Sequence, residues 1–202
     1  MVPAKINHPA LYRAYQFFAA LHTALPTWAG GKQGQLSTTD QTLVYTILST
    51  PQQQRLFATM PPNDQRHAIA VALTLQQAGH TEPALLQAAL LHDVGKSIGQ
   101  PIFHRVTIVL LEAFWPSMLD TLSKLPKHSH PADSMIRSIT WWRRPFVVHA
   151  QHPVIGAEWA KNAGCDPLSV ELILKLQDNV GNESTDENTK LLVALQWADN
   201  LN

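Results

Sequence analysis

The hydrophobic positions of this chain repeat with the period of an α-helix. Apolar residues recur three and four positions apart, and no segment shows the sustained alternation of apolar and polar residues that a half-buried strand requires. The pattern predicts helices at 9–25, 39–48, 63–77, 84–93, 102–114, 116–124, 132–142, 151–163, 167–177 and 189–201. We therefore expect an all-α fold, a compact bundle of several helices.

Glycine, proline and capping residues mark several ends of these helices. Glycines that end a helix are expected at Gly79, Gly95 and Gly164. Pro83 stands at the first position of a helix, where the missing N–H has no consequence. Asp166 is expected to cap the N-terminus of the helix 167–177, with Pro167 at its first position. Asn63 or Asp64 is expected to cap the helix over 63–77.

Composition excludes several classes of protein. Apolar residues make up 45% of the 202 residues and Lys plus Arg balances Asp plus Glu at 15 each, which argues against a disordered chain and against nucleic acid as a partner. A single cysteine rules out an internal disulfide framework and fits a reducing compartment, so the expected location is cytoplasmic. No apolar run approaches the roughly 20 residues of a membrane span.

Four ionisable residues fall on apolar helix faces. His67 shares a face with the apolar residues of 63–77, and His92 and Asp93 end the nearly all-apolar helix 84–93. Asp199 lies on the face of the last helix that carries its leucines. A buried carboxylate needs a cation or a network of donors. Two histidines and two carboxylates suit a borderline or hard divalent metal ion better than thiolate ligands would.

Structural alternatives exist for each residue. His67 alone is more typical of a hydrogen-bonded core histidine, Asp199 near the end of the sequence is equally consistent with a solvated residue, and Asp93 can instead pair with Lys96. The adjacency of His92 and Asp93 after an apolar helix favours the metal site.

In this order, these residues resemble the H…HD…D signature of the HD-domain metal-dependent phosphohydrolases. Residues 88–96 read AALLHDVGK, similar to the family's AALLHDIGK. Residues 198–201 read ADNL in the ADxL context, and residues 152–158 read HPVIGAE, similar to HPxxGAE. The resemblance covers about 64–202. It divides the chain into an HD-type domain at 61–202 and a helical extension at 1–60 packed on the same core.

The resemblance implies a metal held by His67, His92, Asp93 and Asp199. In that family the ion activates a water molecule and polarises a phosphoryl oxygen. The implied activity is hydrolysis of a phosphoester in a nucleotide or another small phosphorylated compound, with Asp93 orienting or deprotonating the water. One divalent ion is expected, and Mn, Fe, Zn, Ni and Mg all suit parts of this ligand set.

Two departures from the family pattern leave an alternative open. The His-His-Glu stretch of the binuclear branch reads Leu176, Gln177 and Asp178 here, which argues against a second metal. The glutamate of the HDxxE branches is also absent, since Ser97 follows Lys96. The alternative is a catalytically silent HD-like module that binds a nucleotide or a protein partner for regulation.

Three further residues are candidates for contacts with the substrate. Lys96 offers a point charge to a phosphate, and is also a candidate catalytic residue beside Asp93; Arg105 offers a bidentate fork. His152, at the entry to a helix, is a candidate pocket residue. The alternatives are a helix-terminal role for Lys96 and a solvated Arg105.

Overall fold

The computed structural model describes residues 36–97, 107–108, 110–111, 114–124, 139–178 and 186–202. All regular secondary structure in these ranges is helical, which confirms the predicted all-α class. The chain divides into two units. The main unit comprises 35–98, 131–133 and 151–202, and the second unit comprises 1–34, 99–130 and 134–150.

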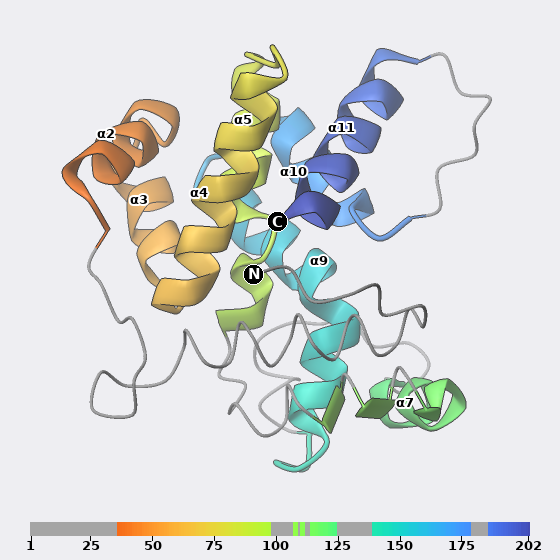
Figure 1. Ribbon diagram of the computed structural model, residues 1–202. Helices are drawn as coiled ribbons and strands as arrows, with labels where there is room; N and C mark the ends of the chain where they lie inside the picture. The colour runs from red at the N-terminus through yellow and green to blue at the C-terminus, as the bar shows by residue number, and fades with distance from the viewer. Residues whose placement is uncertain (1–35, 98–106, 109, 112–113, 125–138, 179–185) are drawn as a thin grey trace, which may run out of the picture. The chain divides into compact units, whose positions relative to one another are not determined.

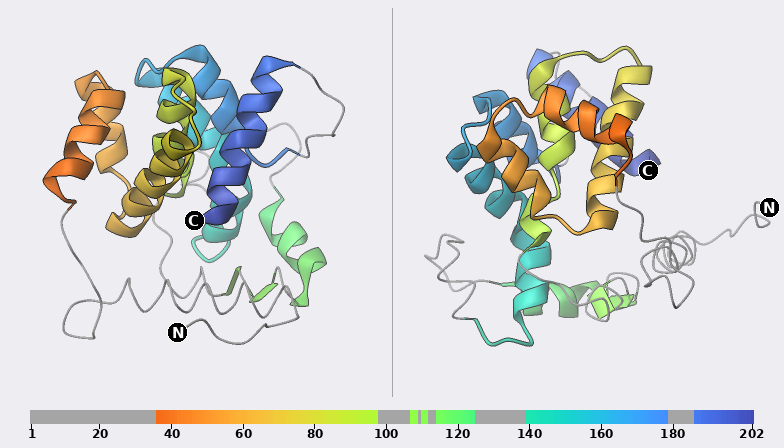
Figure 2. Two further views of the ribbon diagram at one scale, coloured as in Figure 1. Left: turned by 45° about the horizontal axis from the view of Figure 1, so that its top comes forward. Right: turned by 90° about the vertical axis from the view of Figure 1, so that its left-hand side faces the viewer.

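The main unit is a bundle built around one apolar helix. It contains α2 (Thr38–Ile47), α3 (Pro51–Ala58), α4 (Pro62–Gln77), α5 (Pro83–Leu91), the 3₁₀ turn η2 (Val94–Ser97), the end of α9 (Arg144–Asn162), α10 (Pro167–Lys175) and α11 (Glu187–Leu201). Every residue of α5 from Leu85 to Leu91 is buried, and α5 packs against α2, α3, α4, α10 and α11 (Figures 1 and 2). An all-round apolar helix is stable only in such a central position.

Most of the residues predicted to begin or end a helix do so in the structure. Gly79 and Gly164 have φ of 92° and 71°, in the left-handed region that favours glycine. After Gly79 the N–H of His80 donates to Leu75, the bond that closes a Schellman motif. Pro83 opens α5, and the Asp166 side chain accepts from the N–H of Leu168 at the start of α10.

One helix was not predicted. α3 begins after Thr50, whose hydroxyl accepts from the N–H of Gln53 while the Gln53 side chain accepts from the N–H of Thr50. This reciprocal capping box, followed by Pro51 at the first helical position, is visible in the sequence as T-P-Q-Q. The side-chain Nε2 of Gln53 donates to the backbone carbonyl of Gly164, which connects α3 to the end of α9.

Other expected boundaries were wrong. Ser37 caps α2, which begins at Thr38 and not at 39, and neither Asn63 nor Asp64 caps α4, which begins at Pro62. α9 begins at Arg144 and continues through Pro153, whereas a start at 151 was expected. Residues 139–142 form no helix, so this part of the expected helix 132–142 is wrong. The expected helix 9–25 lies outside the described residues.

The second unit has its own small core. Ile108, Leu111, Leu119 and Phe146 are buried together, and Leu119 comes from α7 (Pro116–Ser123). The guanidinium of Arg143 donates to the carbonyl oxygens of Leu122 and Lys124 at the end of α7, where helix carbonyls lack intrahelical partners.

None of the helices in the described ranges combines the length and apolar character needed to cross a bilayer.

Candidate metal centre

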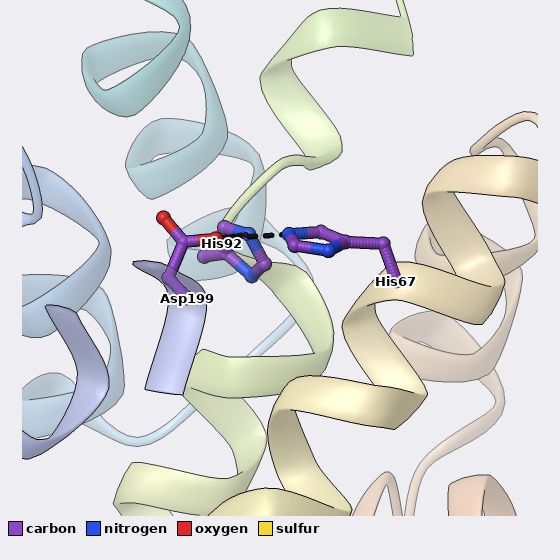
Figure 3. Close-up of side chains that lie close together, drawn as sticks. All are labelled: His67, His92 and Asp199. Atoms are coloured by element: carbon purple, nitrogen blue, oxygen red, sulfur yellow. Dashed lines mark hydrogen bonds and ion pairs between the residues drawn. The ribbon is translucent and has the colours of Figure 1, made fainter. Parts of the chain in front are cut away.

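Three segments of the main unit bring His67, His92 and Asp199 together (Figure 3). His67 comes from α4, His92 follows the last residue of α5, and Asp199 comes from the last turns of α11. α4 packs against both α5 and α11, which places the three segments side by side. The apolar faces that bury these helices therefore also aim the three polar side chains at one point.

The donor atoms have the spacing of a single coordination sphere. Nε2 of His67 lies 2.9 Å from Oδ1 of Asp199, and Nε2 of His92 lies 3.4 Å from the same oxygen. One ligand atom from each residue lies within 4.8 Å of the others. Ligand atoms that share one ion sit about 2.1 Å from it and hence about 3 to 3.5 Å apart. The arrangement fits a divalent ion.

The orientation of the His92 ring is set by the helix that precedes it. Nδ1 lies 2.9 Å from the carbonyl oxygen of Ala89, so Nδ1 carries the proton and donates it. In the neutral ring Nε2 then holds the lone pair, the form that binds a metal. Nε2 is fully buried and has no hydrogen-bond partner among the described residues. A buried polar atom in this state points to a missing ligand.

The two carboxylates of the site are ionised. Burial raises the pKa of Asp199, but the hydrogen bond with His67 and the charge of His92 outweigh burial and hold it well below its usual range. Burial alone would lower the pKa of His92, but Asp93 and Asp199 outweigh burial and raise it to about 9. The metal-free site is thus a strongly coupled set of opposite charges.

Asp93 lies beside the group of three but is bound to a different partner. Its Oδ1 is 3.6 Å from Nε2 of His92 and 2.7 Å from Nζ of Lys96. Burial raises the pKa of Asp93, and the charges of Lys96, His92 and His152 outweigh it, so the carboxyl stays ionised. The pairing with Lys96 that the sequence left as an alternative is therefore present, next to the candidate ligands.

His152 reaches the same carboxylate from α9. Its side chain is buried, and Nε2 lies 3.8 Å from Oδ1 of Asp93. This approach depends on Gly95, because a Cβ at that position would lie 2.1 Å from the carbonyl oxygen of His152 and 2.9 Å from the N–H of Gly156. Gly95 was expected to end a helix. It instead lies in η2 without a left-handed φ, and its role is to allow α9 to pass close by.

Two features of the site were missed from the sequence, and one candidate residue cannot be placed. The backbone carbonyl of Ala89 orients the His92 ring. The spacing of three positions at the end of a helix is the sequence signal from which this contact could have been predicted. Asp64 is buried, although the sequence suggested only a capping role for it. Burial lowers the pKa of Lys96, whereas the charges of Asp93 and, more weakly, Asp64 raise it. Arg105 lies outside the described residues.

No family model, curated protein or solved structure matches this chain, so its geometry is the guide to its function.

Proposed function

We propose that this protein is a metal-dependent phosphohydrolase of the HD type, acting on a phosphoester of a nucleotide or another small phosphorylated compound. One observation carries the proposal. The buried Nε2 of His92 is turned toward Asp199 and has no hydrogen-bond partner among the described residues. The resemblance of the sequence to HD-domain enzymes supports the same ligands.

The proposed ligands of one divalent ion are His67, His92 and Asp199, with Asp93 as the fourth. Bound there, the ion would supply a polarised phosphoryl oxygen and a water of lowered pKa. His92 is held in its ligating tautomer by Ala89, so no rearrangement of the ring is needed. The ionised carboxylate of Asp199 supplies the negative charge that retains a cation.

Asp93 and Lys96 are the proposed residues for the chemistry and for substrate. The Asp93 carboxylate is ionised and buried, so it can accept a hydrogen bond from the attacking water and orient it. Lys96 is partly exposed, with 28% of its side chain accessible, and can offer its ammonium to a phosphate oxygen. His152, whose Nε2 lies 3.8 Å from the same carboxylate, is the proposed positioning residue for Asp93.

Metal content tests the proposal directly. The full chain is stripped with a chelator, incubated with Mn²⁺ or Zn²⁺, desalted and measured by elemental analysis. We expect about one ion per chain for the wild type, and background values for His92→Ala and Asp199→Asn, because each removes one of the four proposed protein ligands. His80→Ala is the matched control, since the His80 side chain pairs with Glu82 and is not among the proposed ligands, so this variant should keep its metal.

Hydrolysis of a panel of phosphomonoesters and phosphodiesters, including nucleotides, is then measured on the loaded chain. Phosphate or alcohol release that His92→Ala abolishes supports the enzyme. Equal metal content in His92→Ala and the wild type would show that the ligand assignment is wrong. Bound metal without hydrolysis of any substrate would favour the alternative, a silent module that binds a nucleotide or a protein partner.

A further inference from the structure

Lys96 and Asp93 neutralise each other in the metal-free site. Nζ of Lys96 lies 2.7 Å from Oδ1 and 2.7 Å from Oδ2 of Asp93, so the ammonium faces both oxygens of the carboxylate. The Asp93 side chain is only 9% exposed, which leaves little water to weaken the pair. While this pair is intact, the charge of Lys96 is not available to an anion.

The same carboxylate lies within reach of the candidate metal ligands. Oδ1 of Asp93 is 3.6 Å from Nε2 of His92, close to the spacing of about 3 to 3.5 Å between donors that share an ion. Asp93 therefore contacts the ammonium of Lys96 and lies within reach of an ion that His92 would hold. At equal distance a divalent charge attracts a carboxylate about twice as strongly as an ammonium does.

We infer that the site binds its metal and a phosphate anion in a coupled order: Asp93 turns toward the cation, and Lys96 is released to hold a phosphate oxygen. This inference rests on the proposed function, because it requires an ion at His67, His92 and Asp199. It adds to that function a rule of assembly, in which the anion site is complete only after the metal has bound. By thermodynamic reciprocity, phosphate strengthens metal binding by the same factor.

Inorganic phosphate is the probe, and calorimetric titration measures its affinity. We expect the Mn²⁺-loaded wild type to bind phosphate at least about tenfold more tightly than the metal-free wild type. The loaded Lys96→Met variant should lose most of this gain, and Lys96→Arg should restore part of it. Lys175→Met is the matched control, because Lys175 also pairs with a carboxylate, that of Glu171 at 2.6 Å, on the exposed side of α10.

A second experiment releases Lys96 without any metal. Asp93→Asn removes the charge that holds the ammonium, so the metal-free variant should bind phosphate about tenfold more tightly than the metal-free wild type. The double variant Asp93→Asn with Lys96→Met should lose this gain. That loss separates a specific role of Lys96 from the general effect of removing one negative charge.

The outcomes distinguish this inference from the proposed function. If the chain takes up metal but phosphate binds equally well with and without it, the coupling is wrong and the metal centre stands. A loaded Lys96→Met that binds phosphate as tightly as the loaded wild type, or a double variant that keeps the gain of Asp93→Asn, would also overturn the coupling. If no metal binds, the proposed function fails and the coupling fails with it.

Discussion

A proton on His92 competes with the metal. Burial lowers the pKa of this ring, but the carboxylates of Asp93 and Asp199 outweigh burial and raise it from 6.5 to about 9. A cation can bind Nε2 only after that proton has left. We expect metal affinity to rise with pH up to about 9 and to level off above, measured by competition with a chelator at each pH.

The same shift has a consequence for stability. Because the pKa of His92 is raised in the folded protein, its protonation stabilises the metal-free fold fully below pH 6.5, and this contribution is lost as the pH rises through about 9. The free energy of unfolding of His92→Gln should lack that dependence. A metal affinity that does not change across this pH window would contradict the assigned ligand role of His92.

A buried amide also has a measurable role. Gln87 interrupts the apolar helix α5, and its Oε1 accepts from the N–H of Asp166 at 2.8 Å, at the start of α10. We expect Gln87→Leu to leave this N–H without its partner and to destabilise the fold by about 1 to 3 kcal/mol in denaturant unfolding. Gln76→Leu, at an exposed position of α4, is the control and should change little. Equal stability of the two variants would show that the bond contributes nothing.

At the scale of helices and turns, the close approach of η2 and α9 depends on Gly95. A Cβ there would lie 2.1 Å from the backbone oxygen of His152, and backbone cannot yield as a flexible side chain can. We expect Gly95→Ala to lower the free energy of unfolding by on the order of 3 kcal/mol or more.

The control for Gly95→Ala separates steric conflict from backbone strain. Gly79 has φ of 92° and open space around its Cα, so Gly79→Ala introduces strain without a clash. Its expected cost is about 1 to 2 kcal/mol. If Gly95→Ala were no more destabilising than Gly79→Ala, the contact between η2 and α9 would be more adaptable than the structure indicates.

At the scale of the whole molecule, the candidate metal centre connects distant parts of the sequence. His67 and Asp199 are 132 residues apart and meet across the bundle of the main unit. An ion that binds this group binds only the folded chain, so it stabilises the fold by mass action. At a concentration about 100-fold above its dissociation constant, we expect a gain of about 2.7 kcal/mol.

Thermal or denaturant unfolding with and without a chelator measures this gain. Asp199→Asn should unfold at the same midpoint in both conditions, because it has lost the ligand that α11 supplies. A metal-induced shift of equal size in Asp199→Asn would place the ion elsewhere.

The sequence determined the class of fold and many of its boundaries. Apolar periodicity identified most of the described helices, and the local conformational needs of Gly79, Pro83 and Asp166 identified some of their ends, because these signals depend only on neighbouring residues. The start of α9 at Arg144 was not predicted, since the local preference of a proline places Pro153 in the first turn of a helix and packing overrides that preference.

The candidate site divides in the same way. His67, His92 and Asp199 could be identified from the sequence because polar residues on apolar helix faces are costly unless something binds them. Only the tertiary structure decided that Asp93 pairs with Lys96, that His152 approaches from α9, and that Gly95 allows this approach. These contacts depend on the distance between segments that are far apart in the chain, and helical periodicity carries no information about that distance.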